Sequence, residues 1–246
     1  MADTRGVFVL SDIVDSNLSD DWVNLNDVWI APRVNSGYFG GGFDGAATRS
    51  TMDKVTYSSD TTAAVPGAAL SAARRYLAAT GNSTSGYFGG GFPGPHSTMD
   101  KTSYSSDTTA AVPGANLSAA RYALAATGNS TAGYFGGGSP TASTMDKVSY
   151  ASDTRSTVPG ASLSIARGYL AATGNATAGY FGGGTDTTPN PDLYYSTMNK
   201  LTYSSDTTAA VPGASLINNR AYHAATGNST AGYFGGGYTT TKVSCC

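Results

Sequence analysis

The 246-residue sequence contains no glutamate, so its 16 acidic residues are all aspartate, and charged residues make up only 12% of the chain. It lacks the clustered lysine and arginine typical of nucleic-acid-binding proteins, and its net charge is −2. No apolar run approaches membrane-spanning length, and the first residues lack the basic and apolar regions of a signal peptide. We therefore expect a protein made in a cytosol that neither inserts into a membrane nor binds nucleic acid.

Side chains used in metal binding and catalysis are scarce. His96 and His223 are the only histidines, and neither has cysteine or carboxylate partners at metal-ligand spacing. The two cysteines, Cys245 and Cys246, are adjacent, and such neighbours seldom bridge each other, so we expect a buried apolar strand end, with an intermolecular bridge as the alternative. The sequence thus predicts a non-enzymatic protein without a metal or cofactor.

The sequence is rich in one repeated hexapeptide. Gly-Tyr-Phe-Gly-Gly-Gly occurs five times, starting at Gly37, Gly86, Gly133, Gly179 and Gly232. After each of the first four copies an insert precedes Ser-Thr-Met-Asp/Asn-Lys, and the inserts comprise residues 43–49, 92–96, 139–142 and 185–195. Without the inserts, a constant frame of 42 residues separates successive copies. Insertions confined to one point of a repeat are expected on one face of the assembly.

Each frame contains four short strand candidates. In the first complete frame they are residues 75–80, a strand beginning at residue 87, residues 99–104 and residues 109–112, stopped by Pro113 and Gly114. Gly81 and Asn82 are expected to form the first hairpin turn with positive φ. The connection at residues 115–120 allows one helical turn at most, so the sequence predicts an all-β fold.

Four strands in about 40–50 residues is the period of a β-propeller blade. The pattern resembles the kelch repeat in its glycine run, in a tyrosine of the third strand (Tyr57, Tyr104, Tyr150, Tyr203) and in an arginine of the connection (Arg74, Arg121, Arg167, Arg220). The tryptophan of the fourth kelch strand is replaced by alanine and valine, which implies a thinner outer edge. The resemblance implies a kelch-like repeat β-propeller over residues 36-246, and a β-solenoid is the alternative.

Two strands are missing from the repeat and have candidates near the N-terminus. The first frame lacks a strand one, for which residues 28–32 stand in the right place, and the fifth lacks a strand four, which residues 6–10 would supply. We therefore expect a five-bladed kelch-like β-propeller closed by an N-terminal strand, which leaves no long open edge. Residues 1-35 then form an N-terminal closure and attachment segment.

The order of segments carries a second resemblance. The opening Thr-Arg-Gly-Val-Phe-Val-Leu, then Asp-Trp-Val-Asn-Leu-Asn-Asp-Val-Trp-Ile-Ala-Pro and the glycine-aromatic repeats, resembles virion structural or fibre proteins of tailed phages of marine cyanobacteria. The resemblance implies a multi-copy or homo-oligomeric virion protein, assembled in the host cytoplasm, whose repeat domain faces outward. The alternatives are an intracellular kelch-type propeller that binds a protein, and a carbohydrate-active propeller, which the likeness of the repeated groups disfavours.

Two sets of residues are binding candidates. Trp22 and Trp29 lie outside the repeat, and because tryptophan is favoured at interface anchors, they are predicted to attach the chain to other virion proteins. The inserts differ in content on a constant frame, which is typical of binding loops, and neutral variation is the alternative. Their candidate residues are Asp44, Arg49, Phe92, His96, Asp186, Asp192, Tyr194 and Tyr195. Aromatic rings beside carboxylates suit a sugar, so the expected partner is a host surface glycan.

The same few charges recur in each frame. In the first frame they are Asp53, Lys54, Asp60 and Arg74. We interpret them as bonds between blades or across turns, with the arginine reaching a carboxylate or a carbonyl. A circle of identical sugar or ion sites is the alternative.

Overall fold

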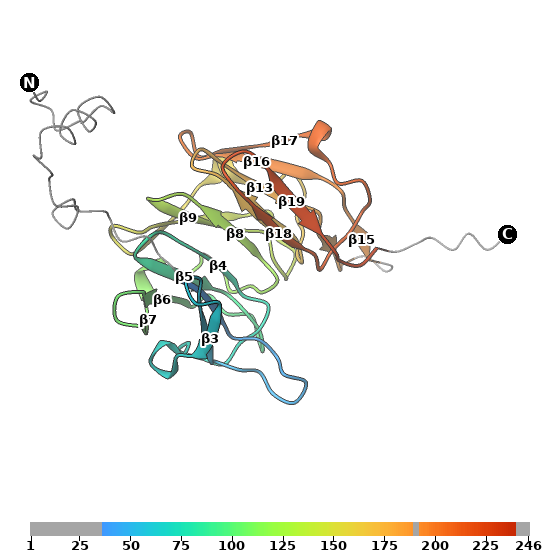
Figure 1. Ribbon diagram of the computed structural model, residues 1–246. Coiled ribbons are helices and arrows are strands. Elements are labelled where there is room, and N and C mark those ends of the chain that lie inside the picture. Colours follow the sequence, from blue (N-terminus) through green and yellow to red (C-terminus); the bar gives the residue numbers. More distant parts are fainter. Residues whose placement is uncertain (1–35, 189–191, 240–246) are drawn as a thin grey trace, which may run out of the picture. The chain divides into compact units, whose positions relative to one another are not determined.

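The computed structural model describes residues 36–188 and 192–239, which belong to one compact unit within Val34–Cys246 (Figure 1). Regular structure in these ranges consists of β-strands and short 3₁₀ turns, without an α-helix. No helix in this part of the chain has the length and apolar character needed to cross a membrane. The predicted closing strands, residues 6–10 and 28–32, lie outside the described residues, as do Trp22, Trp29, Cys245 and Cys246.

The strands form a series of antiparallel sheets, one for each frame. The first sheet consists of β1 (Ser36–Gly40), β2 (Met52–Thr56) and β3 (Thr61–Ala64). The second consists of β4 (Ala78–Gly81), β5 (Ser85–Gly89), β6 (Met99–Ser103) and β7 (Thr108–Ala111). The third consists of β8 (Ala125–Gly128), β9 (Ala132–Gly136), β10 (Met145–Ser149) and β11 (Thr154–Thr157).

The fourth sheet has the same order and an added hairpin. Its strands are β12 (Ala171–Gly174), β13 (Ala178–Gly182), β16 (Met198–Thr202) and β17 (Thr207–Ala210). The hairpin, β14 (Thr185–Asp186) and β15 (Leu193–Tyr194), lies in the longest insert. The fifth sheet is described as β18 (Ala224–Gly227) and β19 (Gly232–Gly235). Strands pair antiparallel within one frame, as in propeller blades, whereas a β-solenoid would pair strands of successive frames.

The predicted four-strand order is confirmed in the second, third and fourth sheets, with two local corrections. Strand one begins at Ala78 rather than residue 75, because Tyr76 has a left-handed φ of 56° that interrupts the extended backbone. The prediction of positive φ at Gly81 and Asn82 is wrong, because neither residue has a positive φ. The Asn82 side-chain oxygen instead accepts hydrogen bonds from the backbone N–H groups of Thr84 (2.9 Å) and Ser85 (3.0 Å), which forms an Asx turn.

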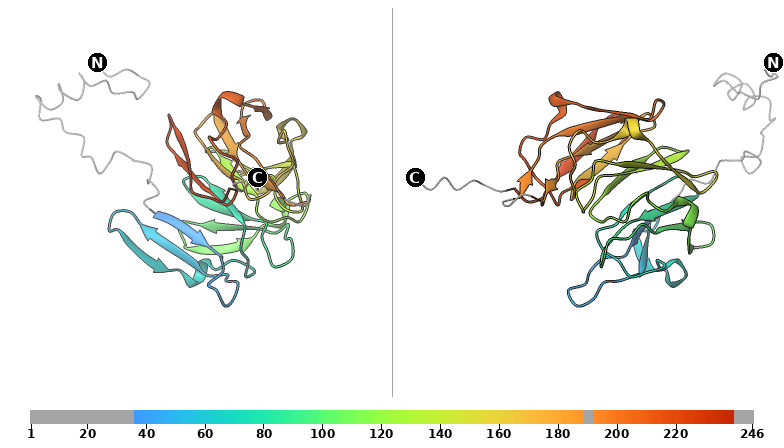
Figure 2. Two further views of the ribbon diagram at one scale, coloured as in Figure 1. Left: turned by 90° about the vertical axis from the view of Figure 1, so that its right-hand side faces the viewer. Right: turned by 180° about the vertical axis from the view of Figure 1, so that it is seen from behind.

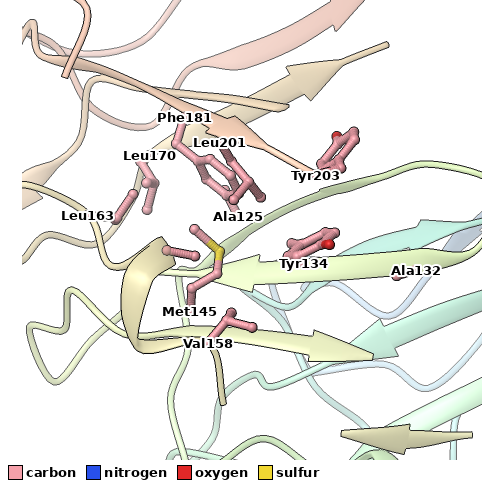
Figure 3. Packing of buried hydrophobic residues seen from close by; sticks show 11 residues of the cluster. Ala125, Ala132, Tyr134, Met145, Val158, Leu163, Leu170, Phe181, Leu201 and Tyr203 are labelled. Carbon is pink, nitrogen blue, oxygen red and sulfur yellow. The ribbon is translucent and has the colours of Figure 1, made fainter. Parts of the chain in front are cut away.

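The hydrophobic core lies between consecutive sheets. Strand one of each sheet packs on strand one of the next, β4 on β8, β8 on β12 and β12 on β18. Figure 3 shows the third-to-fourth interface, where Met145 of β10 faces Phe181 and Leu201 of the next sheet, all almost fully buried. The blade-like sheets follow one another in chain order (Figure 2). Among the described strands, no pairing joins the fifth sheet to the first.

The triple glycine lies where neighbouring sheets approach each other most closely. A Cβ at Gly89, its first residue in the second sheet, would lie 2.7 Å from Met99 Cε and 3.1 Å from Cε1 of Phe135 in the next sheet. Gly91, its third residue, has a φ of 124°, which side chains rarely permit, and donates its N–H to the carbonyl of Arg121 at 3.0 Å. The glycines thus end the strand and let the next sheet approach closely, as the sequence indicates.

Candidate functional site

Among the described residues, the repeated lysine and aspartate join the first sheet to the second, the second to the third and the third to the fourth. The Tyr87 hydroxyl donates to the Asp153 carboxylate, and Lys101 Nζ lies 2.8 Å from Oδ2 of the same carboxylate. We call this arrangement the tyrosine–lysine–aspartate clamp: tyrosine from strand two, lysine from strand three, and aspartate from the turn before strand four of the following sheet. Two further clamps consist of Tyr38, Lys54 and Asp107, and of Tyr134, Lys147 and Asp206.

A tyrosine stack accompanies every clamp. The Tyr87 and Tyr150 ring centroids are 4.9 Å apart, and the corresponding distances at the other two clamps are 4.8 and 5.1 Å. Burial raises the pKa of Tyr150 to about 12, so this hydroxyl stays neutral at physiological pH. The tyrosine that resembles the kelch residue therefore serves the contact between sheets.

The repeated arginine is fully buried within its own sheet. Arg74 Nη2 lies 2.5 Å from Asp100 Oδ2, and the guanidinium also donates to the carbonyls of Phe88 (3.3 Å) and Thr98 (3.0 Å). Arg121 repeats the pair with Asp146 at 2.9 Å. The arginine reaches a carboxylate and a carbonyl, as predicted, but the bonds lie within one sheet and not between blades. These repeated charges hold the frame together and are not available as exposed sites.

In the fourth sheet an amide replaces the carboxylate. Arg167 Nη2 donates to Asn199 Oδ1 at 2.8 Å, and both residues are fully buried. Burial lowers the pKa of Arg167 to about 10, because a charged guanidinium is disfavoured away from water. This is the one described frame in which the buried arginine lacks an anionic partner.

The inserts lie on one face, as predicted, and the connections before strand one pair with them there. Arg75 pairs through its backbone with Phe92, the first residue of the second insert, and His96, the last residue of that insert, pairs with Arg121 of the next connection. Tyr122 and Ser139 repeat the first of these pairings in the third frame. We call this side of the sheets the insert-bearing face.

Aromatic side chains gather on the insert-bearing face. The aromatic surface consists of Phe43, Tyr76, Phe92, Tyr122, Tyr169 and Tyr222. The Tyr169 and Tyr222 ring centroids are 4.2 Å apart, and Tyr76 lies 5.9 Å from Tyr169. The Arg75 guanidinium stacks on the rings of Phe43 (4.6 Å) and Phe92 (5.0 Å). Phe43, Tyr76 and Tyr222 keep about half of their area exposed, at 52%, 47% and 51%.

A ladder of backbone hydrogen bonds holds the tyrosines in place. The N–H of Ala123 donates to the Tyr76 carbonyl (2.7 Å), that of Tyr169 to Ala123 (2.7 Å), and that of Tyr222 to Tyr169 (3.0 Å), so each sheet contributes one residue. All four residues have left-handed φ values, from 53° to 58°. Such a backbone costs a bulky residue about 1–3 kcal/mol, and glycine would avoid the cost. The tyrosines are therefore present for their rings.

Three predicted site residues lie at the aromatic surface. Phe92 belongs to it, with its ring 5.4 Å from that of Tyr122. Burial raises the pKa of Tyr222, and the charges of nearby Tyr194 and Asp192 add to the rise. Asp192 is exposed, and its charge acts on Tyr222.

The other predicted site residues serve their own loops. Asp44 accepts a hydrogen bond from Arg49 Nε at 2.6 Å, and the N–H groups of Ala47 and Ala46, with Arg49, lower the pKa of Asp44 to about 2.

The remaining three predicted residues are bound within their own insert or to a neighbouring one. Asp186 accepts hydrogen bonds from Thr188 and from Thr141 of the preceding insert (3.0 Å). His96 Nε2 lies 3.1 Å from the Pro93 carbonyl, and the N–H of Tyr195 donates to Gly184 at 3.0 Å.

Sequence reasoning missed Tyr76, Tyr122, Tyr169 and Tyr222 because they read as the start of strand one. After the invariant arginine the sequence is Arg-Tyr, Tyr-Ala, Gly-Tyr or Ala-Tyr, while leucine and alanine follow in most frames. Tyrosine thus occurs at one of these two positions in every frame, and this recurrence is the signal that the sequence offers.

Comparison of the sequence with models of known protein families finds no match, and comparison with curated proteins finds none either. Within residues 36–188 and 192–239, no group of three histidine, cysteine or acidic residues is placed to hold a metal ion.

Proposed function

We propose that this chain is a non-enzymatic structural protein of a tailed-phage virion, a tail or head fibre or appendage, whose insert-bearing face recognises the host surface. The observation that carries the proposal is the aromatic surface. A constant frame, held by buried arginines and clamps, displays exposed rings on the same face that receives every change of length. Loops and rings on a rigid scaffold are the usual arrangement of a binding site.

The chemistry of the aromatic surface favours a neutral glycan. Exposed aromatic faces stack on the C–H-bearing face of a sugar, and the tyrosine hydroxyls and Asp192 can exchange hydrogen bonds with sugar hydroxyls. Within the described part of the chain, the cation stacked on these rings is Arg75, which is already engaged with Phe43 and Phe92. An acidic polymer would require several free cations, so a neutral glycan fits better.

Substitution within the aromatic surface tests this proposal. We expect Tyr76→Ala together with Tyr222→Ala to weaken binding to host cells or isolated host glycan at least tenfold, with an unchanged melting temperature. Ile217→Ala is the control, because this apolar side chain is 96% exposed and does not belong to the aromatic surface. Undiminished binding by the double variant would contradict the proposal.

The longest insert provides a second test of the same site. Shortening residues 185–195 to the four-residue length of residues 139–142 removes Asp192 and Tyr194 while the frame is retained. We expect weaker host adsorption by a folded protein. If adsorption is unaltered, this insert does not contribute to the receptor site.

We also propose that the sheets form a closed, kelch-like five-bladed propeller, with residues 6–10 as strand four of the fifth blade and residues 28–32 as strand one of the first. Large aromatic residues exposed on both terminal sheets support closure, because monomers rarely expose such patches. Removal of residues 1–14 should then cause aggregation or loss of cooperative unfolding. A truncated monomer with unchanged melting would argue against closure.

Attachment to the particle is assigned to the segment with Trp22 and Trp29. The virion role predicts that purified particles contain the protein, and that Trp22→Ala lowers its occupancy. Absence from purified particles would favour the intracellular protein-binding alternative.

A further inference from the structure

The aromatic surface is a continuous series of side chains that crosses all five sheets. Each member contacts the next, and the order along the series is Phe43, Arg75, Phe92, Tyr122, Tyr169 and Tyr222. From Phe92 onward the centroids of successive rings are 5.4, 6.2 and 4.2 Å apart. Among the described aromatic pairs, Tyr222 meets only the ring of Tyr169. A ligand the size of one sugar ring can therefore cover one end of the series but not both.

The exposed rings of the aromatic surface are spread along this series. Phe43, Tyr76 and Tyr222 lie next to the first, second and fifth sheets, and each keeps about half of its area in solvent. Tyr76 stands beside the middle of the series, 6.3 Å from Tyr122 and 5.9 Å from Tyr169. A site for one small molecule encloses most of its ligand in a pocket. Rings exposed at intervals instead suit a polymer whose successive units stack on successive side chains.

Arg75 supplies hydrogen-bond donors at the first end of the series. Its guanidinium stacks on the rings of Phe43 and Phe92, which engage its faces and leave the N–H groups in its plane free to donate. Its Nε has no hydrogen-bond partner among the described residues, and none of the ion pairs between described residues includes Arg75. A sugar seated here would stack on the phenylalanines and accept hydrogen bonds from the Nη groups of Arg75.

The second end of the series offers different partners to a sugar. Tyr169 and Tyr222 bring two hydroxyl groups, and the Tyr222 ring is 51% exposed. The exposed carboxylate of Asp192 is near enough for its charge to act on Tyr222. A cationic donor therefore stands at one end of the series, and hydroxyl and carboxylate groups stand at the other, so the two ends form two separate subsites.

The backbone fixes the distance between these two subsites. The ladder joins Tyr76 to Tyr222 through hydrogen bonds of 2.7 to 3.0 Å, and Arg75 is joined to Phe92 by two backbone hydrogen bonds of 2.8 Å. Side chains held in this way lose little conformational freedom when a ligand binds. A chain bound at one subsite presents its other units to the second at a high effective concentration, so occupation of both adds affinity.

We infer that the aromatic surface binds an extended stretch of neutral glycan, several sugar units long, which bridges the Phe43–Arg75 end and the Tyr169–Tyr222 end. The inference rests on the glycan recognition proposed above and adds the length of chain that is recognised. A terminal monosaccharide or a short side branch occupies one end only and binds more weakly.

The dependence of affinity on chain length tests this inference. The probes are the neutral polysaccharide isolated from host cells, fragments of it separated by length after partial hydrolysis, and its constituent monosaccharides. In titration calorimetry with the full chain, affinity should rise at least about tenfold from the monosaccharides to the longest fragments and then stay constant. A monosaccharide that binds as tightly as the polysaccharide would overturn the inference.

Variants at the two ends show whether one chain spans both. Phe43→Ala and Tyr222→Ala should each weaken the binding of long fragments at least about fivefold and that of short fragments less than about twofold, because a short fragment retains the other end. Both rings are half-exposed, so the melting temperature should not change. Ile217→Ala is again the control and should leave the binding of every fragment unchanged. Equal losses for long and short fragments would contradict two bridged subsites.

The outcomes separate this inference from the recognition on which it rests. If the polysaccharide binds and the double variant Tyr76→Ala with Tyr222→Ala abolishes binding, but fragment length has no effect, glycan recognition stands and the extended site is wrong. If neither the polysaccharide nor any fragment binds, both are wrong.

Discussion

The internal and terminal sheets contain the same hexapeptide in two different environments. Tyr87 is completely buried, whereas Tyr233 is 64% exposed, although both lie in Gly-Tyr-Phe-Gly-Gly-Gly. Likewise Phe135 is 0% exposed and Phe39 64%. Each tyrosine is covered by the following sheet and each phenylalanine by the preceding one. The stable unit is therefore the interface between two repeats, and a repeat without its neighbour leaves half of its core in water.

The largest effect is expected at the buried arginine of an internal sheet. Arg74→Met leaves the Asp100 carboxylate, which is 0% exposed, without its cation, and should lower the free energy of unfolding by about 3–5 kcal/mol. Arg220 of the terminal sheet is half-buried and donates only to the Gly236 carbonyl among the described residues, so Arg220→Met should cost under about 1 kcal/mol. Urea unfolding of both variants measures the difference, and equal losses would contradict it.

The next comparison decides whether the terminal faces are free or covered. Phe135→Ala should cost about 3–5 kcal/mol, the usual loss for a buried phenylalanine. If the propeller is closed, Phe39→Ala should lower the free energy of unfolding by more than about 2 kcal/mol, because the fifth blade would cover the ring of Phe39. An effect within about 0.5 kcal/mol, as for an ordinary surface substitution, would show that the face is open.

The fourth sheet allows a gain of stability. Asn199→Asp places a carboxylate against the buried guanidinium of Arg167, as in the second and third sheets. We expect the free energy of unfolding to rise by about 1 kcal/mol. The charge-assisted hydrogen bond to Arg167 should stabilise the folded state by more than the desolvation of the new carboxylate costs, because the guanidinium is already in place. Asp146→Asn is the reciprocal variant and should destabilise. A destabilising Asn199→Asp would mean that desolvation of the carboxylate prevails.

The smallest effect is expected for the loss of folding stability at acidic pH. The hydrogen bond from Tyr38, and then Lys54, lower the pKa of Asp107 below its ordinary value. Its contribution to stability is therefore complete above the unfolded pKa near 3.9 and is lost as the pH falls through the lower folded value. Because this carboxylate is 37% exposed, the loss should stay under about 1 kcal/mol. Tyr38→Phe should flatten the decline of stability below pH 4, and Tyr76→Phe, outside any clamp, should not.

The sequence determined the frame, its four strands, the side on which the inserts lie and the contacts of the arginine, because these follow from signals that act over a few residues. Glycines, Asx turns and a proline after strand four end strands wherever they stand, and removal of the inserts exposes the constant spacing. The two local errors, at Tyr76 and at Gly81-Asn82, arose where a bond to a distant or neighbouring group replaced the conformation that the dipeptide alone favours.

Only the tertiary structure decided which aromatic residues meet. Tyr76 and Tyr169 are separated by a whole sheet in the sequence, and their rings approach to 5.9 Å because the intervening frame places Ala123 in the ladder between them. The same holds for the clamps, whose tyrosine and aspartate lie 66 to 72 residues apart. Contacts of this kind depend on how one sheet is set against the next, and that geometry comes from packing across the triple glycine, not from any local pattern of residues.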